Sequence, residues 1–221
     1  GAKIPYESVT EVPAVANAGN AAVSASRLGL RSGLVAHVGQ DLNGQKCLDS
    51  LQKDGVSTDF VFVDAGKETN YHYVLWFEKD RTILQKHSDF EYSLPEVGKP
   101  KWIYLTSLGE KSLEFHDTIS DYMKNHPEIK LAFQPGIFQI KFGAEALRKT
   151  YEETDIFFCN VEESQTILGE KSRDLSVLLR GIRSLGPKTV VITDGIKGAY
   201  AYQEEKMWFM TVYPHQPFER T

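Results

Sequence analysis

The sequence is poor in cysteine and has no long apolar run. Its 221 residues include only two cysteines, Cys47 and Cys159, which lie far apart and show no zinc-ligand or redox spacing. We therefore expect a reducing, cytoplasmic location. No stretch approaches the roughly 18 apolar residues that a membrane helix needs, and no signal-peptide pattern opens the chain. We expect no membrane partner.

The sequence also has no excess of positive charge and lacks several catalytic motifs. With 25 Lys and Arg against 30 Asp and Glu, the formal net charge is -5, so we expect no nucleic-acid partner. The chain has no Gly-x-Gly-x-x-Gly turn, no Gly-x-Ser-x-Gly elbow and no His-Glu-x-x-His pair. These absences argue against a dinucleotide-dependent oxidoreductase, a serine hydrolase and a zinc protease.

The remaining pattern is typical of an α/β protein. Within residues 14–56 we expect the first part of the core, with an Ala-rich helix that Asn17 could cap and Gly29 ends, a buried strand at 34–38 and an amphipathic helix at 41–53. Residues 93–221 alternate strands and helices at the spacing of crossover units, which predicts a mainly parallel sheet. Its expected strands are 102–105, 130–133, 156–159 and 189–193, with helices near 113–125, 144–151, 161–168 and 175–185 and a final hairpin at 200–212.

A segment with a different sequence pattern separates these two parts of the core. Residues 57–92 hold strand-like runs at 60–63, 71–77 and 82–84 joined by turns, which predicts a small antiparallel β lid. Residues 1–13 show short apolar alternations broken by Pro5 and Pro13, which indicates an edge strand of that lid. In such α/β sheets, ligands bind beyond the carboxyl ends of the parallel strands.

Two stretches in the first half could bind a ligand. Residues 15–22 open a helix with small side chains; free N–H groups lie at the helix start, and Asn20 can donate to and accept from a sugar hydroxyl. Ordinary Ala-rich helix packing explains the same residues. In residues 39–44, which follow a strand, Asp41 either caps the next helix or faces a substrate.

Two stretches in the second half could hold a nucleotide. Asn160 and Glu163 have the spacing of a capping box at the start of a helix. The same pair could place Asn160 near phosphate oxygens and Glu163 near a hydrated Mg²⁺, because a hard cation favours carboxylate and water oxygens. Residues 193–200 by themselves fit a hairpin turn, and the alternative is a wall where Gly195 and Gly198 let a nucleotide lie against the main chain.

The order and spacing of these stretches resemble the PfkB family of ribokinase-like carbohydrate kinases along nearly the whole chain. The resemblance is carried by Ala22, Val23, Arg27, Leu28 and Gly29, by residues 38–44, by Asn160 and Glu163, and by residues 193–198. It implies a three-layer α/β/α core with a mainly parallel sheet and a small antiparallel β lid, incomplete at both ends. It also implies a kinase that transfers the γ-phosphoryl group of ATP to a sugar hydroxyl with Mg²⁺ as the cation.

The resemblance assigns roles to particular residues. Contacts to a small-molecule sugar would come from Gly19, Asn20, Asp41, Asn70, His72 and Lys86. The nucleotide would be lined by Asn160, Thr193, Gly195 and Gly198, and Glu163 would hold Mg²⁺ through water. The lid of such kinases closes over the sugar and often forms a dimer contact, so a homodimer through the lid is expected.

Two departures from the family pattern concern the acceptor. Val15 and Ala16 stand where the family usually has a Gly-Gly pair, which weakens the assignment of Asn20. Residues 134–138 lack the Asp, Asn and Arg of kinases for acidic keto sugars, so a neutral sugar is favoured, although Lys86 leaves an acidic sugar open.

A third departure concerns the catalytic base. The family's first strand would lie upstream of Gly1, and its Gly-Ala-Gly-Asp segment, which carries the catalytic Asp, would follow directly after Thr221. The resemblance therefore assigns no catalytic residue within residues 1–221. Because a positioned general base contributes about 10²–10⁴-fold, we expect no useful kinase activity from this chain alone.

Two alternatives stay open at this point. One is a non-catalytic sugar- or nucleotide-binding module, and the other is a nucleoside kinase of the same family. The sequence does not identify the sugar or nucleoside.

Overall fold

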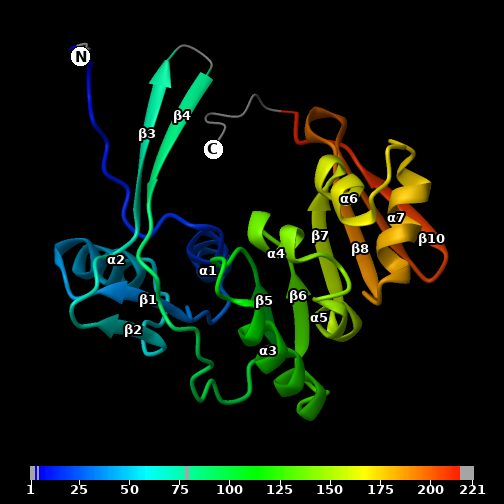
Figure 1. Ribbon diagram of the computed structural model, residues 1–221, viewed down its shortest axis with the longest axis horizontal. Helices are drawn as coiled ribbons and strands as arrows, with labels where there is room; N and C mark the ends of the chain where they lie inside the picture. The colour runs from blue at the N-terminus through cyan, green and yellow to red at the C-terminus, as the bar shows by residue number, and fades with distance from the viewer. Residues whose placement is uncertain (1–2, 4, 78–79, 215–221) are drawn as a thin grey trace. The chain divides into compact units, whose positions relative to one another are not determined.

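The computed structural model of the chain describes residue 3 and residues 5–77 and 80–214 (Figure 1). The chain divides into two compact units, residues 1–90 and residues 91–221, and each is described by itself. Within the described ranges, no helix is long and apolar enough to cross a bilayer.

The first unit contains two helices and a parallel pair of strands. Helix α1 (Asn17–Arg27), strand β1 (Ala36–Gly39), helix α2 (Leu42–Lys53) and strand β2 (Val61–Asp64) follow in order. Helix α1 begins one residue earlier than expected for an Asn17 cap, because Ala16 holds the cap position and Asn17 is already helical. Ala22 of α1, Leu51 of α2 and Val56 form its small buried core.

The parallel pairing of β1 with β2 corrects one prediction. Residues 60–63 were expected in the antiparallel lid, but Val61 lies opposite Ala36 and Asp64 opposite Gly39 in a parallel register. Helix α2 joins the two strands, and a crossover through a helix brings the second strand back parallel to the first. Strand β2 therefore belongs with the α/β part of this unit.

The lid prediction is confirmed for the next two strands. Strand β3 (Tyr71–Phe77) pairs antiparallel with β4 (Asp80–Lys86), with Tyr71 opposite Lys86. This β3–β4 hairpin is a separate two-stranded sheet that projects from the α/β part of its unit (Figure 1). The expectation of a lid strand in residues 1–13 is wrong for residue 3 and residues 5–13, which form no strand. Proline lacks the backbone N–H that a strand ladder needs, and Pro5 and Pro13 interrupt this segment.

The second unit is built on a six-stranded sheet in the order β10-β9-β8-β7-β6-β5. Strands β5 (Trp102–Leu105), β6 (Lys130–Phe133), β7 (Ile156–Asn160) and β8 (Thr189–Thr193) are parallel, and β9 (Ala199–Gln203) and β10 (Lys206–Met210) complete it in antiparallel fashion. The helices are α3 (Leu113–Asn125), α4 (Ile137–Phe142), α5 (Arg148–Glu153), α6 (Val161–Leu168) and α7 (Leu175–Ser184), and η1 (Gly195–Lys197) is a 3-10 turn. The predicted mainly parallel sheet is confirmed.

One predicted helix differs from the structure. Of the helix expected near residues 144–151, only the part from Arg148 is helical, as α5, and a second short helix, α4, which was not predicted, ends just before Gly143. Gly143 has φ 84°, a left-handed backbone value that glycine adopts without steric cost and that interrupts a right-handed helix.

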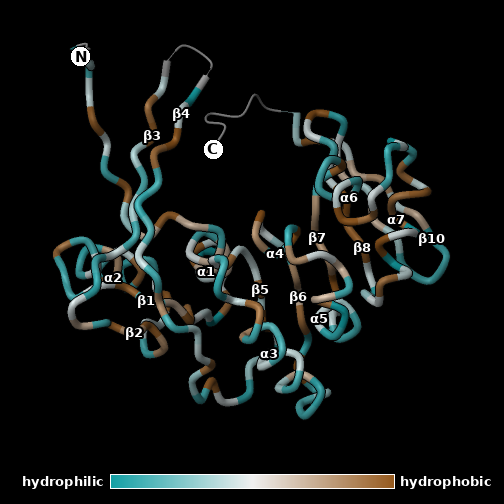
Figure 2. Tube along the Cα trace, viewed as in Figure 1, coloured by the Kyte–Doolittle hydropathy of each residue, from teal (hydrophilic) through white to brown (hydrophobic). Residues whose placement is uncertain are grey.

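One face of the sheet carries the main core of the second unit. Alternate side chains of the central strands are buried there, which Figure 2 reflects in the hydrophobic colour of β6 to β8. Phe133, Tyr151 and Phe157 form an aromatic cluster with ring centroids 5.2–5.7 Å apart. Leu178 and Ile182 of α7 are fully buried in the same cluster of residues. This packing fixes the strands whose carboxyl ends carry the predicted nucleotide residues.

Candidate functional site

In the first unit, Asp41 occupies the loop between β1 and α2. Its Oδ1 accepts hydrogen bonds from the Gly44 N–H at 2.7 Å and from the Thr69 hydroxyl at 2.7 Å, and its Oδ2 accepts from the Thr69 N–H at 2.8 Å. The Thr69 hydroxyl, followed by the two backbone N–H groups, lowers the pKa of Asp41 because each donor favours the carboxylate. The capping interpretation of Asp41 is confirmed, and its role toward a sugar stays a prediction.

A small hollow of about 200 Å³ lies beside Asp41. It is lined by Gly39, Gln40, Asp41, Gly44, Gln45, Leu48 and Val63, which come from the end of β1, the start of α2 and β2. The hollow therefore lies at the carboxyl end of β1, the edge where ligands of α/β sheets bind.

The base of the β3–β4 hairpin holds three more of the predicted sugar residues. Asn70 accepts a hydrogen bond from the Ser88 N–H through its Oδ1. Lys86 forms an ion pair with Glu68 that raises the lysine pKa, and its ammonium lies 5.5 Å from the centre of the Tyr71 ring. The positive charge of Lys86 is thus matched within the hairpin base.

His72 points to the other side of the hairpin. Successive residues of a strand face opposite sides, so His72 and its register partner Gln85 lie on the face opposite Tyr71 and Lys86. Burial, and to a smaller extent the charge of His87, lower the pKa of His72. The structure therefore brings Lys86 and His72 to the same end of the hairpin without directing them to one face.

Gly19 and Asn20 lie in the first turn of α1. Gly19 is buried, and a Cβ at this position would come within 2.4 Å of the Ala14 carbonyl oxygen, so the backbone approach itself requires glycine. Asn20 is exposed, and its side chain forms no hydrogen bond with the residues that the structure describes. This arrangement agrees with close helix packing and leaves the sugar role of both residues a prediction.

In the second unit, Asn160 and Glu163 form a reciprocal capping box. Asn160 Oδ1 accepts from the Glu163 N–H and Glu163 Oε2 accepts from the Asn160 N–H, both at 2.8 Å. Thr193 lies directly opposite Asn160 in the β7–β8 register. The sheet thus brings Asn160 and Thr193, which are distant in the chain, together at the carboxyl edge of the parallel strands.

The glycine-rich segment after Thr193 is a tight turn between β8 and β9. The Asp194 N–H donates to the Gly198 carbonyl at 2.9 Å, and Gly195 and Gly198 have φ values of 53° and 103°. A Cβ on Gly198 would also lie 2.3 Å from the Met210 carbonyl oxygen. The hairpin interpretation is confirmed, and the same turn places both glycines next to Thr193.

A chain of ion pairs joins this turn to helix α6. Arg173 contacts Glu162 Oε1 at 2.9 Å and Asp194 Oδ1 at 3.5 Å, and Lys197 contacts Asp194 Oδ2 at 3.1 Å. Arg173 lowers the pKa of Glu162. Sequence reasoning missed Arg173 and Thr69, since neither stands in a recognisable motif.

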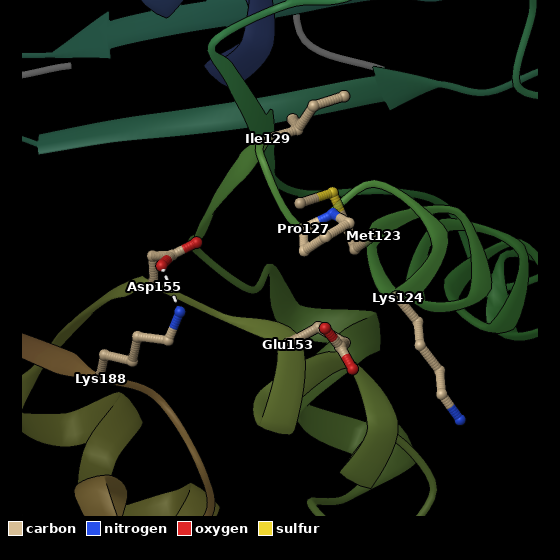
Figure 3. Close-up of a pocket in the computed structure, with 7 residues that line it drawn as sticks. All are labelled: Met123, Lys124, Pro127, Ile129, Glu153, Asp155 and Lys188. Atoms are coloured by element: carbon tan, nitrogen blue, oxygen red, sulfur yellow. Dashed lines mark hydrogen bonds and ion pairs between the residues drawn. The ribbon is translucent and has the colours of Figure 1, made fainter.

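A hollow of the second unit lies at the opposite edge of its sheet. It measures about 270 Å³ and is lined by Met123, Lys124, Pro127, Ile129, Glu153, Asp155 and Lys188 (Figure 3). Asp155 and Lys188, which face each other in Figure 3, precede β7 and β8 and are joined at 2.8 Å. Asp155 also accepts from the Leu131 N–H at 2.9 Å, so it links neighbouring strand starts. None of the predicted site residues lines this hollow.

Glu163 is the residue that the sequence predicts to hold a cation through water. Among the described residues, no group of three or more His, Cys, Asp or Glu could enclose a metal. Glu163 uses Oε2 in the capping box, and its Oε1 has no partner in the described part of the chain. Mg²⁺ in proteins retains several waters and takes one or two carboxylates, so this oxygen is compatible with the role, which stays a prediction.

The expected position of the catalytic Asp falls outside the described residues. The sequence resemblance puts this Asp after Thr221, and the structure describes the second half of the chain only as far as residue 214. Thr221 is therefore itself one of the residues that the structure does not describe. The place of the catalytic base stays a prediction.

The chain is similar to known kinases in sequence and in fold. A nucleoside kinase of Methanothermobacter thermautotrophicus is 26% identical over 195 residues, which cover 85% of this chain and 60% of that protein. The chain thus spans about 60% of the length of this relative. The structure of a fructokinase from Vibrio cholerae with fructose, ADP and calcium bound has a TM-score of 0.73 at 20% identity, covering 92% of this chain and 70% of that one. A fructokinase from Halothermothrix orenii has a TM-score of 0.73 at 19% identity, covering 88% of this chain and 73% of that one.

These structural matches confirm the ribokinase-like fold predicted from the sequence. The family profile described as pfkB family carbohydrate kinase matches residues 17–218, which include every predicted site residue. The chain belongs to the pfkB family of carbohydrate kinases.

Proposed function

We propose that this chain is part of an ATP-dependent kinase that phosphorylates a hydroxyl group of a neutral sugar or a nucleoside. The observation that carries the proposal is the meeting of Asn160, Glu163 and Thr193 at the carboxyl edge of β7 and β8. A phosphoryl-transfer enzyme depends mainly on aligning its substrates and stabilising phosphate charge, and this edge offers groups for both.

The second unit would hold the nucleotide. Asn160 would contact phosphate oxygens, Thr193 with Gly195 and Gly198 would line the nucleotide, and Glu163 would hold Mg²⁺ through water. The positive end of the α6 dipole supports an anion at this position. When bound, ATP with Mg²⁺ would supply the phosphoryl group, and these residues would orient it.

The first unit would hold the acceptor. Gly19, Asn20, Asp41, Asn70, His72 and Lys86 remain the proposed contacts. The ion pair between Lys86 and Glu68 supports a neutral acceptor, because the lysine charge is already balanced. The similarity to a nucleoside kinase supports a nucleoside as the second candidate acceptor.

Binding of MgATP to the purified chain tests the nucleotide assignment. We expect calorimetry to show binding that depends on Mg²⁺ and weakens about tenfold or more in Asn160→Ala, since this variant removes a side chain proposed to contact phosphate. Glu163→Gln keeps an acceptor for the Asn160 N–H but removes the charge, so it should weaken the Mg²⁺ dependence selectively. Glu153→Gln at the opposite edge of the sheet is the matched control. Equal binding by all four proteins would refute the assignment.

Turnover separates a kinase from a non-catalytic binding module. The chain with MgATP and a panel of neutral sugars and nucleosides is assayed for ADP release and for the phosphorylated product. We expect binding without useful turnover from residues 1–221 alone, and phosphorylation by a longer protein that carries the Gly-Ala-Gly-Asp segment after Thr221. Binding without turnover by that longer protein would favour the non-catalytic module.

We also propose that two copies associate through the β3–β4 hairpin. Tyr73, Leu75 and Leu84 on one face and Val74, Trp76 and Ile83 on the other are 41–60% exposed. A two-stranded hairpin is marginal by itself, and apolar side chains on both faces favour cover by a partner. Light scattering should give a dimer mass for the wild type and a monomer for Leu75→Glu, with Leu28→Glu, the same change at an exposed leucine outside the hairpin, as control. A monomeric wild type would refute the association.

A further inference from the structure

Thr69 is buried at the start of the β3–β4 hairpin, although its neighbours Glu68 and Asn70 are exposed. Only 5% of Thr69 is accessible. Its hydroxyl accepts a hydrogen bond from the Gly39 N–H at 2.9 Å and donates to Asp41 Oδ1 at 2.7 Å, while its own N–H donates to Asp41 Oδ2 at 2.8 Å. All three contacts therefore go to the end of β1 and to Asp41, which follows it.

Gly39 at the end of β1 and Gly44 in the first turn of α2 leave the space in which Thr69 lies. A Cβ on Gly39 would lie 2.4 Å from the Lys67 carbonyl oxygen and 2.6 Å from the Thr69 nitrogen. A Cβ on Gly44 would lie 2.2 Å from the Gly39 carbonyl oxygen and 3.0 Å from the Thr69 hydroxyl. Gly39, Asp41 and Gly44 thus form a close-fitting seat for Thr69, which we call the Thr69 socket.

The socket connects the capped start of α2 to a two-stranded hairpin. Asp41 is itself held at the start of α2 through the Gly44 N–H, and hydrogen bonds to a carboxylate are stronger than those between neutral groups. The hairpin beyond Thr69 has only two strands and contributes little to its own stability. The direction in which the hairpin leaves its unit therefore depends on how its base is held.

The returning strand is tied to the same base. Asn70, next to Thr69 in the chain, accepts a hydrogen bond from the Ser88 N–H, which follows β4. Glu68, on the other side of Thr69, forms its ion pair with Lys86 at the end of β4. Fixing Thr69 thus fixes both strands of the hairpin where they begin and end.

We propose that Thr69 is a positioning residue whose seat in the socket of Gly39, Asp41 and Gly44 sets the orientation of the β3–β4 hairpin. The socket holds Lys86 and His72 at a defined place relative to the hollow beside Asp41. Asp41 then influences the hairpin orientation by binding Thr69. Gly39 and Gly44 leave the space that this contact needs. Only the consequence for acceptor binding rests on the proposed function.

Hydrogen–deuterium exchange of the purified chain, followed by mass spectrometry, tests the proposal directly. Thr69→Val keeps the size and the N–H of the residue but removes both hydroxyl contacts, and Thr69→Ser keeps the hydroxyl. We expect the amides of residues 70–88 to exchange about tenfold faster or more in Thr69→Val, because this variant loses a hydrogen bond to a charged group. In Thr69→Ser these amides should exchange near the wild-type rate. Thr82→Val makes the same chemical change at an exposed position of β4 and should leave the exchange unchanged.

A second variant changes Asp41, the partner of Thr69 in the socket. Asp41→Asn can still cap α2 through its amide oxygen, but its amide nitrogen cannot accept the Thr69 N–H. We expect it to accelerate exchange in residues 70–88 as Thr69→Val does, while the amides of α2 stay protected. If the hairpin exchanges at the wild-type rate in Thr69→Val, or if all of residues 5–77 accelerate equally, the positioning role is overturned.

Acceptor binding separates this proposal from the proposed function. Where the wild type binds a sugar or nucleoside, calorimetry should show weaker acceptor binding in Thr69→Val, unchanged MgATP binding, and recovery in Thr69→Ser. Acceptor affinity unchanged in Thr69→Val would overturn the functional part of the proposal. If the wild-type chain binds no acceptor, the proposed acceptor-binding function of the first unit is refuted. The hydrogen-exchange rates then still test the positioning role of Thr69.

Discussion

His116 should make the second unit less stable in mild acid. It lies on α3, is only 2% exposed and contacts the Phe133 ring at a centroid distance of 5.7 Å. Neither of its ring nitrogens has a hydrogen-bond partner among the described residues. Burial lowers the pKa of His116 from 6.5 to about 4, because the charged imidazolium would lose its hydration and the charge of Asp117 offsets only part of that loss.

The sign and size of the effect follow from this pKa. Between pH 6.5 and about 4 the unfolded chain binds a proton at His116 that the folded chain does not. The contribution of the neutral His116 ring to the free energy of unfolding is therefore fully present above pH 6.5. This contribution is lost as the pH falls toward 4. At about 1.4 kcal/mol per pH unit, the loss amounts to roughly 2 kcal/mol at pH 5 and about 3 kcal/mol over the whole range.

Urea unfolding at pH 7 and pH 5 measures this loss. Tryptophan fluorescence in a Trp76→Phe background reports only Trp102 and Trp208, which both belong to the second unit. His116→Leu replaces the imidazole with an apolar side chain of similar size that cannot titrate. We expect the stability difference between the two pH values to shrink by about 2 kcal/mol in His116→Leu. The same difference in both proteins would refute the reasoning, since other groups would then account for the acid sensitivity.

Three further predictions concern single side chains. In thermal unfolding, Gly198→Ala should lower the stability by more than Gly143→Ala. Both positions have positive φ, which costs an alanine about 1 kcal/mol, but only at Gly198 would the added Cβ also clash with backbone atoms. Equal losses of stability would contradict this. Asn160→Ala should cost about 1 kcal/mol of unfolding free energy and Asn160→Asp far less, since Asp also caps helices; a similar loss in both would argue against the cap. Maleimide labelling followed by mass spectrometry should modify the partly exposed Cys47 before Cys159, whose thiol is buried and has a raised pKa; simultaneous labelling in the folded chain would contradict the burial.

Local patterns in the sequence predicted most helices and strands of the second unit. The buried run at 130–133 became β6 with its expected bounds, and the helices expected at 113–125 and 161–168 became α3 and α6. Their periodicity and their caps lie within a few residues, so short windows of sequence contain the necessary information. The helix expected at 144–151 was only partly right, because residues 144–147 form turns and α5 begins at Arg148.

Part of the candidate site could be predicted in the same way. The capping box of Asn160 and Glu163 depends on two residues three positions apart, and its sequence spacing is sufficient to identify it. The meeting of Asn160 with Thr193 required the parallel register of β7 and β8, which no local pattern specifies. Arg173 reaches both Glu162 and Asp194 only after α6, the following loop and β8 are in place.

The sequence by itself determined the α/β character of this protein, its helix caps and its likeness to one kinase family, because these depend on neighbouring residues and on the order of short motifs. Tertiary structure alone decided that β2 pairs with β1, that Lys86 and His72 face opposite sides of the hairpin, and that Asp41 holds Thr69. The Asp41–Thr69 contact spans 28 residues. Its two partners meet only when the β1–α2–β2 crossover has folded, and a contact made by chain geometry leaves no periodic signal in the sequence.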